Sequence, residues 1–410
     1  MKLGKRAWLV AGALFFAGLL AVAFWPVSSP FLWTYPSAYG SPLTAPDGTI
    51  YINNNSGELV ALNPDGTVRW KSFVGKFGII RMARGPDGAI YVSRSSIGPH
   101  SGLVSVSPSG TTNWVFREAG PISGKPVFST DGTIYVGGHW SNLHALNPDG
   151  TERWRFPTAG KISDSPVVAP DGTIAFVSED TNCYALHADG TLRSKFFLED
   201  QRSRHLAFAP AINPDGSLVL CGWTNLMVLS LDGALDWKTN LFERDSAGKA
   251  TGWAYAYAAP VVSNEGTIYF STVEGSLQAL GGDGRFQWSY HRGFGYRGEQ
   301  HFTILPKGSL LVAHEKTFQV PIATNRYGFG TEEAAVVQLK PDGSEQWRVE
   351  INGQFRWHRF FNFSNFKYER QTGFGIRGHQ NLSQPVAGPN GTIYIRSDHG
   401  LHAIQPPGKK

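Results

Sequence analysis

The chain has few cysteines and few charged residues. Cys183 and Cys221 are the only cysteines among 410 residues, and no Cys-x-x-Cys or Cys/His cluster occurs, which argues against a structural metal site. Two buried free thiols are the favoured interpretation, and one disulfide in an oxidising compartment is the alternative. Charged residues make up 17%, the formal net charge is +5, and no Lys/Arg run follows the first residues. Nothing therefore indicates a nucleic-acid partner.

The N-terminal segment is the part of the sequence that indicates export. Basic residues precede an uncharged apolar run from Ala7 to Trp25, so residues 1–25 are predicted to be a signal peptide or an N-terminal membrane anchor. Ala21-Val22-Ala23 offers a cleavage site near Ala23, whereas an uncut run at residues 7–25 would attach the protein to the inner membrane. No cysteine stands directly after the apolar run, so a lipid-anchored lipoprotein is excluded. The expected location is periplasmic or cell-surface, and cleavage or anchoring stays open.

Glycine and proline are abundant, with 48 and 25 residues, and they recur in a turn of the type Pro-Asp-Gly. Two interleaved series of eight turns follow the N-terminal segment. One series starts at Pro46, Pro86, Thr130, Pro170, Pro214, Asn264, Pro306 and Pro389, and the other at Pro64, Pro108, Pro148, Ala188, Leu231, Gly282, Pro341 and Pro406. Short runs of alternating apolar residues flank each turn, which predicts β-hairpins with glycine at positive φ. No capped helical pattern follows Trp25.

Two hairpins per unit give four strands, named A to D here, at the period typical of a propeller blade. The fourth strand usually carries tryptophan, for which packing between blades is the favoured role: Trp70, Trp114, Trp154, Trp237, Trp288 and Trp347. Ser194 takes this position in the fourth unit. The last unit stops at Pro406 without a fourth strand, and Phe31-Leu-Trp-Thr-Tyr supplies one, with Trp33 in the tryptophan position. The prediction is an all-β fold: residues 30–410 form one eight-bladed β-propeller of four-stranded antiparallel blades, closed by an N-terminal strand.

The pattern Ala-Leu-Asn-Pro-Asp-Gly-Thr-x-x-Trp, at Ala61 to Trp70 and at Ala145 to Trp154, resembles the repeat of the pyrroloquinoline-quinone (PQQ)-like eight-bladed propellers. That family includes PQQ-dependent dehydrogenases and the BamB-type subunit of the outer-membrane assembly machinery. The resemblance implies the fold but hardly constrains function, because the repeated residues are turns and packing positions. For a quinoprotein it implies adjacent cysteines, a calcium held by Glu, Asn and Asp, and an Asp base. The chain has no adjacent cysteines and no recognisable calcium set, so no cofactor, no metal site and no catalytic residue is predicted.

The long insertions are expected on one face of the ring. The A–B and C–D turns should share one face, whereas the B–C and D–A connections should share the other, which we call the long-loop face. Every long insertion belongs to the second class: residues 197–205, 240–257, 291–301, 314–333 and 351–383. Since loops on a rigid scaffold carry binding residues, this face is the predicted functional surface.

A motif is shared by two of these insertions. Gly293-Phe-Gly-Tyr-Arg-Gly-Glu-Gln precedes blade seven, and Gly373-Phe-Gly-Ile-Arg-Gly-His-Gln precedes blade eight. A duplicated corner whose Arg bonds loop carbonyls is the structural interpretation. The functional interpretation is a site for an anion, carboxylate or sugar at the mouth of the central channel. The candidate residues are Arg297, Glu299, Gln300, Arg377, His379 and Gln380.

Further candidates on this face are basic or aromatic. They are Arg204 and His205 before blade five, Trp253, Tyr255 and Tyr257 before blade six, and Trp357 in the most aromatic insertion. Such side chains suit sugar stacking or protein recognition, and loop packing is the alternative. We therefore expect an exported, non-enzymatic, monomeric ring that binds a protein or a glycan. The alternatives are a PQQ- and calcium-dependent oxidoreductase, or a degenerate relative that still binds PQQ, and an outer-membrane protein assembly factor of the BamB type.

Overall fold

The structure is a computed structural model with strands as almost its sole regular elements. It describes residues 30–54, 56–75, 80–198, 208–244, 248–256, 258–273, 275–291, 301–323, 326–351, 377–378, 382–397 and 400–407. In that part of the chain the one helical element is a 3-10 turn, η2, at Pro306–Gly308. Within the same ranges, no helix has both the length and the apolar character needed to cross a membrane.

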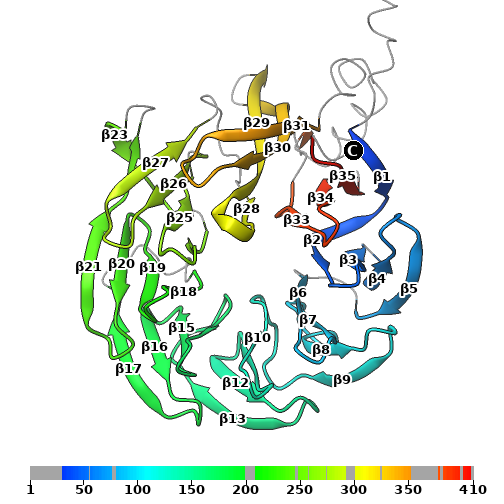
Figure 1. Cartoon of the computed structure of the whole chain (residues 1–410). Coiled ribbons are helices and arrows are strands. Elements are labelled where there is room, and N and C mark those ends of the chain that lie inside the picture. Colours follow the sequence, from blue (N-terminus) through cyan, green and yellow to red (C-terminus); the bar gives the residue numbers. More distant parts are fainter. Residues whose placement is uncertain are drawn as a thin grey trace, which may run out of the picture.

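Eight antiparallel sheets stand around a central opening (Figure 1), which confirms the predicted eight-bladed propeller. Blades one to four are formed by β2 (Ala38–Thr44), β3 (Ile50–Asn54), β4 (Glu58–Leu62) and β5 (Val68–Phe73); β6 (Ile80–Arg84), β7 (Ile90–Arg94), β8 (Gly102–Val106) and β9 (Thr112–Phe116); β10 (Val127–Phe128), β11 (Ile134–Gly137), β12 (Asn142–Leu146) and β13 (Glu152–Pro157); and β14 (Val167–Val168), β15 (Ile174–Ser178), β16 (Asn182–Leu186) and β17 (Leu192–Phe197).

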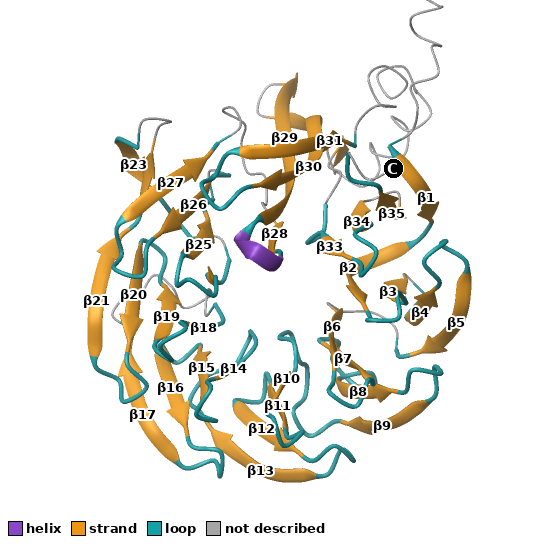
Figure 2. Ribbon diagram, viewed as in Figure 1, coloured by secondary structure: helices purple, strands orange, loops and turns teal. Residues whose placement is uncertain are grey.

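The other four blades continue the ring (Figure 2). They are formed by β18 (Ala211–Ile212), β19 (Leu218–Cys221), β20 (Asn225–Leu229) and β21 (Leu235–Asn240); β24 (Val261–Val262), β25 (Ile268–Ser271), β26 (Leu277–Leu280) and β27 (Phe286–Tyr290); β28 (His301–Ile304), β29 (Leu310–Ala323), β30 (Arg326–Leu339) and β31 (Glu345–Glu350); and β33 (Val386–Ala387), β34 (Ile393–Ser397), β35 (Gly400–Ile404) and β1 (Phe31–Tyr35).

The ring closes through β1, as the sequence predicts. β1 pairs antiparallel with β35, with Trp33 opposite Ala403 and Tyr35 opposite Leu401. The Thr34 hydroxyl lies 3.0 Å from Nδ1 of His402 on β35, and Phe31 stacks on the same imidazole at 4.2 Å. The last blade therefore has its full set of four strands, and its third strand is not left as an open edge.

The recurring turns have the predicted geometry. In the fifteen turns whose glycine is described, that glycine has a φ between 76° and 92°. In the first of them, the Gly48 N–H donates to the Ala45 carbonyl at 3.0 Å, and the Thr49 N–H donates to Oδ1 of Asp47 at 3.0 Å. These turns have the left-handed glycine expected of a Pro-Asp-Gly hairpin connection. The turn at Pro306 departs from the type I pattern, because Lys307 before the glycine also has a positive φ of 72°.

The tryptophans of strand D join neighbouring blades. The indole N–H donates to the carbonyl that opens the C–D turn of the next blade: Trp33 to Pro64, Trp70 to Pro108, Trp114 to Pro148, Trp154 to Ala188, Trp237 to Gly282 and Trp288 to Pro341, at 2.9–3.1 Å. The Ser194 hydroxyl replaces the indole and donates to the Leu231 carbonyl at 2.8 Å. The predicted inter-blade packing is confirmed, and Ser194 preserves the hydrogen bond without the ring. Trp347 packs against blade eight, but its indole N–H donates to Oε1 of Gln338 in its own blade at 2.7 Å.

Buried side chains form layers between successive blades. One layer joins Tyr51 and Leu59 of blade one to Ile90 and Val92 of blade two. Strands B and C are buried on both faces, as in β3 and β8, because each blade is covered by a neighbour on either side. This arrangement explains why most residues of these strands are apolar, whereas the outer strands alternate between exposed and less exposed residues.

Three predicted loops contain strands. Within residues 240–257, β22 (Phe242–Arg244) pairs with β23 (Ala250–Trp253) as a separate hairpin. Residues 314–333 were expected to be a loop, but β29 and β30 stay paired as far as Ala323 and Arg326. The alternation of Phe318, Val320 and Ile322 with intervening residues favours this continuation. β32 (Arg377–Gly378) adds to β30 in parallel.

Candidate binding face

The two faces of the ring differ in the side chains they expose. Strand D starts at the C–D turn and ends on the long-loop face, as in β5, where Leu62 pairs with Val68 and Glu58 with Phe73. Ten large hydrophobic side chains are exposed in the described residues. Those at the turn face are aliphatic: Leu32, Val68, Leu192 and Leu235. Those at the long-loop face are Tyr39, Phe73, Ile97, Trp140, Phe197 and Trp253, of which all but Ile97 are aromatic.

Three described tryptophans stand outside the repeat position, and all three lie on the long-loop face. Trp140 is in the β11–β12 loop, Trp223 is in the β19–β20 loop, and Trp253 ends β23. The sequence reasoning identified Trp253 but missed Trp140 and Trp223. The signal for both was available, because neither occupies the strand D position that the other tryptophans share.

The indole ring of Trp140 is packed on one face and exposed to solvent on the other. One face of its indole lies on Gly120, where an added Cβ would come within 2.6 Å of Cδ2 and where φ is +68°. The backbone of its loop is fixed, since the Asn142 amide donates to the Trp140 carbonyl at 2.9 Å and the His139 N–H donates to the Pro121 carbonyl at 2.9 Å. With 59% of the residue exposed, Trp140 presents a fixed apolar surface to solvent.

The β22–β23 hairpin positions the two aromatic residues predicted before blade six. Trp253 packs on Phe242 across the hairpin, with ring centroids 5.0 Å apart, and is 52% exposed. Tyr255 packs on Trp223 of blade five at 5.4 Å. The structure therefore brings Trp253 and Tyr255 to the predicted face, and each has an aromatic neighbour that restricts its motion.

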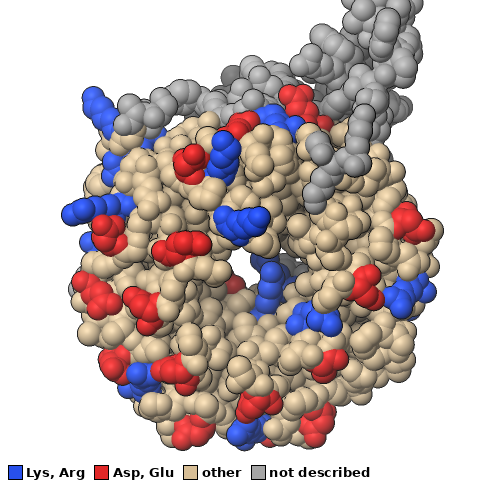
Figure 3. Space-filling model, in the orientation of Figure 1, with Lys and Arg blue, Asp and Glu red and all other residues tan. Residues whose placement is uncertain are grey.

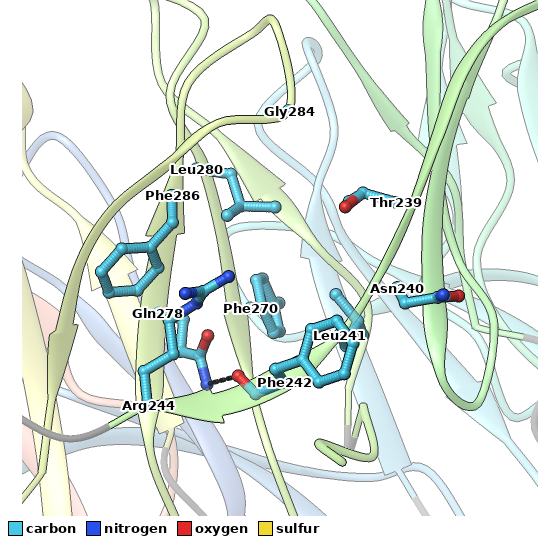
Figure 4. A pocket seen from close by; sticks show the side chains of 10 residues that line it. All are labelled: Thr239, Asn240, Leu241, Phe242, Arg244, Phe270, Gln278, Leu280, Gly284 and Phe286. Carbon is cyan, nitrogen blue, oxygen red and sulfur yellow. Dashed lines mark hydrogen bonds between the residues drawn. The ribbon is translucent and has the colours of Figure 1, made fainter. Parts of the chain in front are cut away.

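A small pocket marks the junction of this hairpin with blade six (Figure 4). The guanidinium of Arg244 lies over the Phe286 ring at 4.5 Å and donates to the Gly248 carbonyl at 2.8 Å. The buried Gln278 amide donates to the Phe242 carbonyl at 3.0 Å. The pocket holds about 20 Å³, room for one water molecule rather than an organic ligand. We therefore assign this pocket to the contact that attaches the β22–β23 hairpin to blade six, and not to ligand binding.

Glu243 fixes the same hairpin from its other side. Its Oε2 accepts the Ser276 hydroxyl at 2.8 Å and lies 3.3 Å from Nε2 of His291. Burial acts to raise the pKa of the Glu243 carboxyl, but hydrogen bonds from His291, Thr272 and Ser276 bring that pKa below its ordinary value. Glu243 is therefore a carboxylate at neutral pH, and it ties the hairpin to blade six.

Equivalent polar contacts occur in blades three and four. The Ser123 hydroxyl lies 2.8 Å from Nε2 of His139, and the Ser163 hydroxyl donates to Glu179 at the corresponding place in the next blade. Burial, followed by the charge of Lys161, lowers the pKa of His139, which is neutral at pH 7. Since His and Glu play the same part in neighbouring blades, we assign the Ser123–His139 contact to the attachment of the D–A connection and not to catalysis.

Most of the sequence-predicted site residues lie outside the described part of the chain. They are Arg204, His205, Tyr257, Arg297, Glu299, Gln300, Trp357, His379 and Gln380, together with the N-terminal residues 1–25. Arg377 is described only in its backbone, which pairs with Phe329 in β32 and β30. The shared motif before blades seven and eight therefore stays a sequence prediction.

The cysteines and the acidic side chains bear on the quinoprotein alternative. Cys183 and Cys221 are free and buried in separate blades, and burial raises the pKa of each thiol to about 12. In the ranges that the structure describes, no three His, Cys, Asp or Glu side chains gather where they could hold a metal ion. Adjacent cysteines, which the quinoprotein resemblance implies, do not occur in the sequence.

Comparisons with known proteins support the repeat and the fold. The model of a family described as outer membrane protein assembly factor BamB matches residues 100–288. No curated protein sequence matches the chain. The computationally designed protein Ika8 is 10% identical with a TM-score of 0.61, covering 92% of this chain and 98% of that one, a likeness of fold alone.

Two natural proteins are also structurally similar. BamB from Moraxella catarrhalis is 13% identical with a TM-score of 0.47, covering 79% of this chain and 95% of that one. Streptogramin B lyase is 12% identical with a TM-score of 0.47, covering 92% and 95%. The chain is an eight-bladed β-propeller that carries, over residues 100–288, the repeat of the PQQ-like, BamB-type family that its turns and tryptophans predicted.

Proposed function

We propose that this protein is an exported, non-enzymatic scaffold that captures a protein partner on its long-loop face. The observation that carries the proposal is the unequal distribution of exposed aromatic side chains. All five that are described as exposed, Tyr39, Phe73, Trp140, Phe197 and Trp253, lie at the long-loop end of the blades. Aromatic anchors held by their surroundings are typical of the energetic centres of protein interfaces, because little conformational entropy is lost when they bind.

The rigidity of the anchors supports a protein partner in preference to a loop-packing role. Trp140 lies on Gly120, Trp253 on Phe242 and Tyr255 on Trp223, so these rings are already fixed before a partner arrives. The name of the matching family, an outer membrane protein assembly factor, supports a role in the cell envelope. The segment at residues 1–25 supports export, and the proposal includes a location in the periplasm or at the cell surface.

The motif residues belong to the same proposal. Arg297 and Arg377, with Glu299, Gln300, His379 and Gln380, are proposed to add polar contacts to the partner, as are Arg204 and His205. Trp357 is proposed as a further aromatic anchor. No cofactor and no catalytic residue is part of this function, and the ring is proposed to act as a monomer.

The experiment compares partner capture by single variants of the exported protein. We expect Trp140→Ala and Trp253→Ala each to weaken recovery of the partner, whereas Leu235→Ala should leave it unchanged. Leu235 is the matched control, because it is 48% exposed at the turn face. All three side chains are exposed, so the melting temperature should stay near that of the unmodified protein. Equal recovery by all variants would contradict the proposal.

A further inference from the structure

A separate group of charged side chains faces the centre of the ring. Figure 3 shows an open hollow there, with Lys or Arg atoms inside it. Among the described residues of the inner strands and the three residues before each, three cations stand in blades two and three: Arg81 and Arg84 on β6, and Lys125 two residues before β10. The matching acidic residue is Asp164, three residues before β14.

The inner segments of blades three, four and five are joined by close contacts and hydrogen bonds near these charges. An added Cβ on Gly124 would come within 2.5 Å of the Asp164 carbonyl carbon, and the Lys125 N–H donates to the Ser165 hydroxyl at 2.8 Å. The carboxylate of Asp164 accepts the Ser165 N–H at 2.7 Å and the Ala209 N–H at 3.1 Å. The one acidic group near the cations is therefore engaged by two backbone donors.

The like charges of Arg81 and Lys125 act on each other, and Asp164 is the described acidic residue that acts on Lys125. Neither side chain makes a hydrogen bond or ion pair with another described residue. Burial lowers the pKa of the Lys125 ammonium, the Arg81 charge lowers it further, and the Asp164 charge offsets these effects only in part. Lys125 is nevertheless in contact with solvent, as expected of a side chain that lines a narrow hollow.

We propose that Arg81 and Lys125 form a binding site for a small oxyanion, a carboxylate or phosphate group, in the wall of the central hollow. A guanidinium and an ammonium of adjacent blades would share such a group, with the Arg offering a planar pair of donors and the Lys a point charge. Enclosure by the ring strengthens the attraction relative to a fully solvated pair. Lys125 belongs to a D–A connection, so the site lies where the long-loop face meets the central hollow. Its residues differ from those of the function proposed above, on which it does not depend.

Arg84 provides a matched control on the same strand. Met82 packs in the layer between blades one and two, and the alternation of β6 places Arg84 on that same side and Arg81 on the side of blade three. The charge of Arg84 acts to lower the pKa of the Tyr51 hydroxyl in blade one, which agrees with a position of Arg84 on the side of blade one. Both arginines are exposed. Arg81→Gln and Arg84→Gln therefore each remove one positive charge, and the two charges lie on opposite sides of β6.

The test is calorimetric titration of the full exported protein with sodium phosphate and, in a second series, with sodium succinate, at constant ionic strength. We expect saturable binding of at least one of the two, and the arm that responds identifies the oxyanion. Arg81→Gln and Lys125→Gln should each weaken it by about tenfold or more, the effect of removing one charged hydrogen-bond partner. Arg84→Gln and Lys125→Arg should retain it.

Two results would overturn the site. One is the absence of saturable binding of both anions by the unmodified protein. The other is equal binding by Arg81→Gln, Lys125→Gln and Arg84→Gln, which would indicate a general effect of net charge. Circular dichroism of each variant, compared with that of Lys125→Arg, separates a lost site from a lost fold.

Discussion

Tryptophan has two distinct roles at the scale of single residues. In strand D it packs between its own blade and the next, and its indole N–H donates to a carbonyl of that next blade, as Trp154 does to Ala188. On the long-loop face Trp140 and Trp253 are exposed instead. A tryptophan outside the strand D position of the repeat is therefore a candidate for binding, whereas one in that position is explained by packing.

The packing of the strand D tryptophan against the next blade can be tested by substituting the turn glycine that its indole ring contacts. In the C–D turn of blade four, an added Cβ on Gly190 would lie 2.7 Å from Cδ2 of Trp154. In the equivalent turn of blade five, an added Cβ on Gly233 would lie 3.4 Å from the side chain of Ser194. The two glycines have φ values of 87° and 85°, so the conformational cost of a side chain is the same at both.

We expect Gly190→Ala to destabilise the protein more than Gly233→Ala, by about 1–3 kcal/mol, the usual cost of overpacking. Both variants also share the cost of a left-handed alanine, about 1 kcal/mol. The measurement is the free energy of unfolding in urea. Equal losses would show that the tryptophan does not restrict this position.

At the scale of elements, the sequence predicted what is repeated. The turn pattern and the position of Trp33 predicted eight blades and the closing strand β1 correctly, because each is copied along the chain and each copy reinforces the interpretation. The β22–β23 hairpin and the extension of β29 and β30 were missed. Both occur once, and a short alternating run without a repeated partner does not reveal what it will pair with.

The candidate site was harder to predict than the fold for the same reason. Trp253 and Tyr255 were found because several aromatic residues are adjacent in the sequence. The contact of Trp140 with Gly120 joins residues of two different loops, and Arg81 and Lys125 belong to different blades. Such contacts depend on the three-dimensional ring, and no local motif records them.

The turns make a prediction about acid stability. In five of them the hydroxyl of the second following residue is the largest cause that lowers the pKa of the turn aspartate: Asp65, Asp149, Asp189, Asp215 and Asp342. A carboxyl whose pKa is lower in the folded state stabilises the fold above its unfolded pKa, and this stabilisation is lost as the pH falls through the folded value.

From these groups we expect a constant melting temperature between about pH 7 and pH 5 and a decline below about pH 4, near the unfolded pKa of Asp. Replacing Asp65, Asp149 and Asp189 together by Asn should make the decline shallower, because an amide does not titrate. Thermal unfolding followed by circular dichroism measures both curves. An unchanged slope in the triple variant would show that other carboxyl groups cause the acid sensitivity.

At the scale of the whole molecule, the ring separates structural positions from candidate binding positions. The turn face carries the repeated hairpin connections and exposes aliphatic side chains, whereas the long-loop face carries the β22–β23 hairpin and the aromatic side chains that are exposed among the described residues. The central hollow (Figure 3) adds a third region, where we propose an oxyanion site at Arg81 of β6 and Lys125 before β10. One repeated unit thereby yields surfaces of different chemistry, because only the connections on one side vary in length.

The most direct test of this account places a photo-crosslinking amino acid at both ends of the same outer strands. Phe73 and Phe197 lie at the long-loop ends of β5 and β17, and Val68 and Leu192 lie at the turn ends, with exposed fractions of 55%, 52%, 44% and 48%. Illumination of cells that produce each variant should give an adduct with a partner from positions 73 and 197 and none from positions 68 and 192. Adducts of equal or greater yield from positions 68 and 192 would contradict the assignment of binding to the long-loop face.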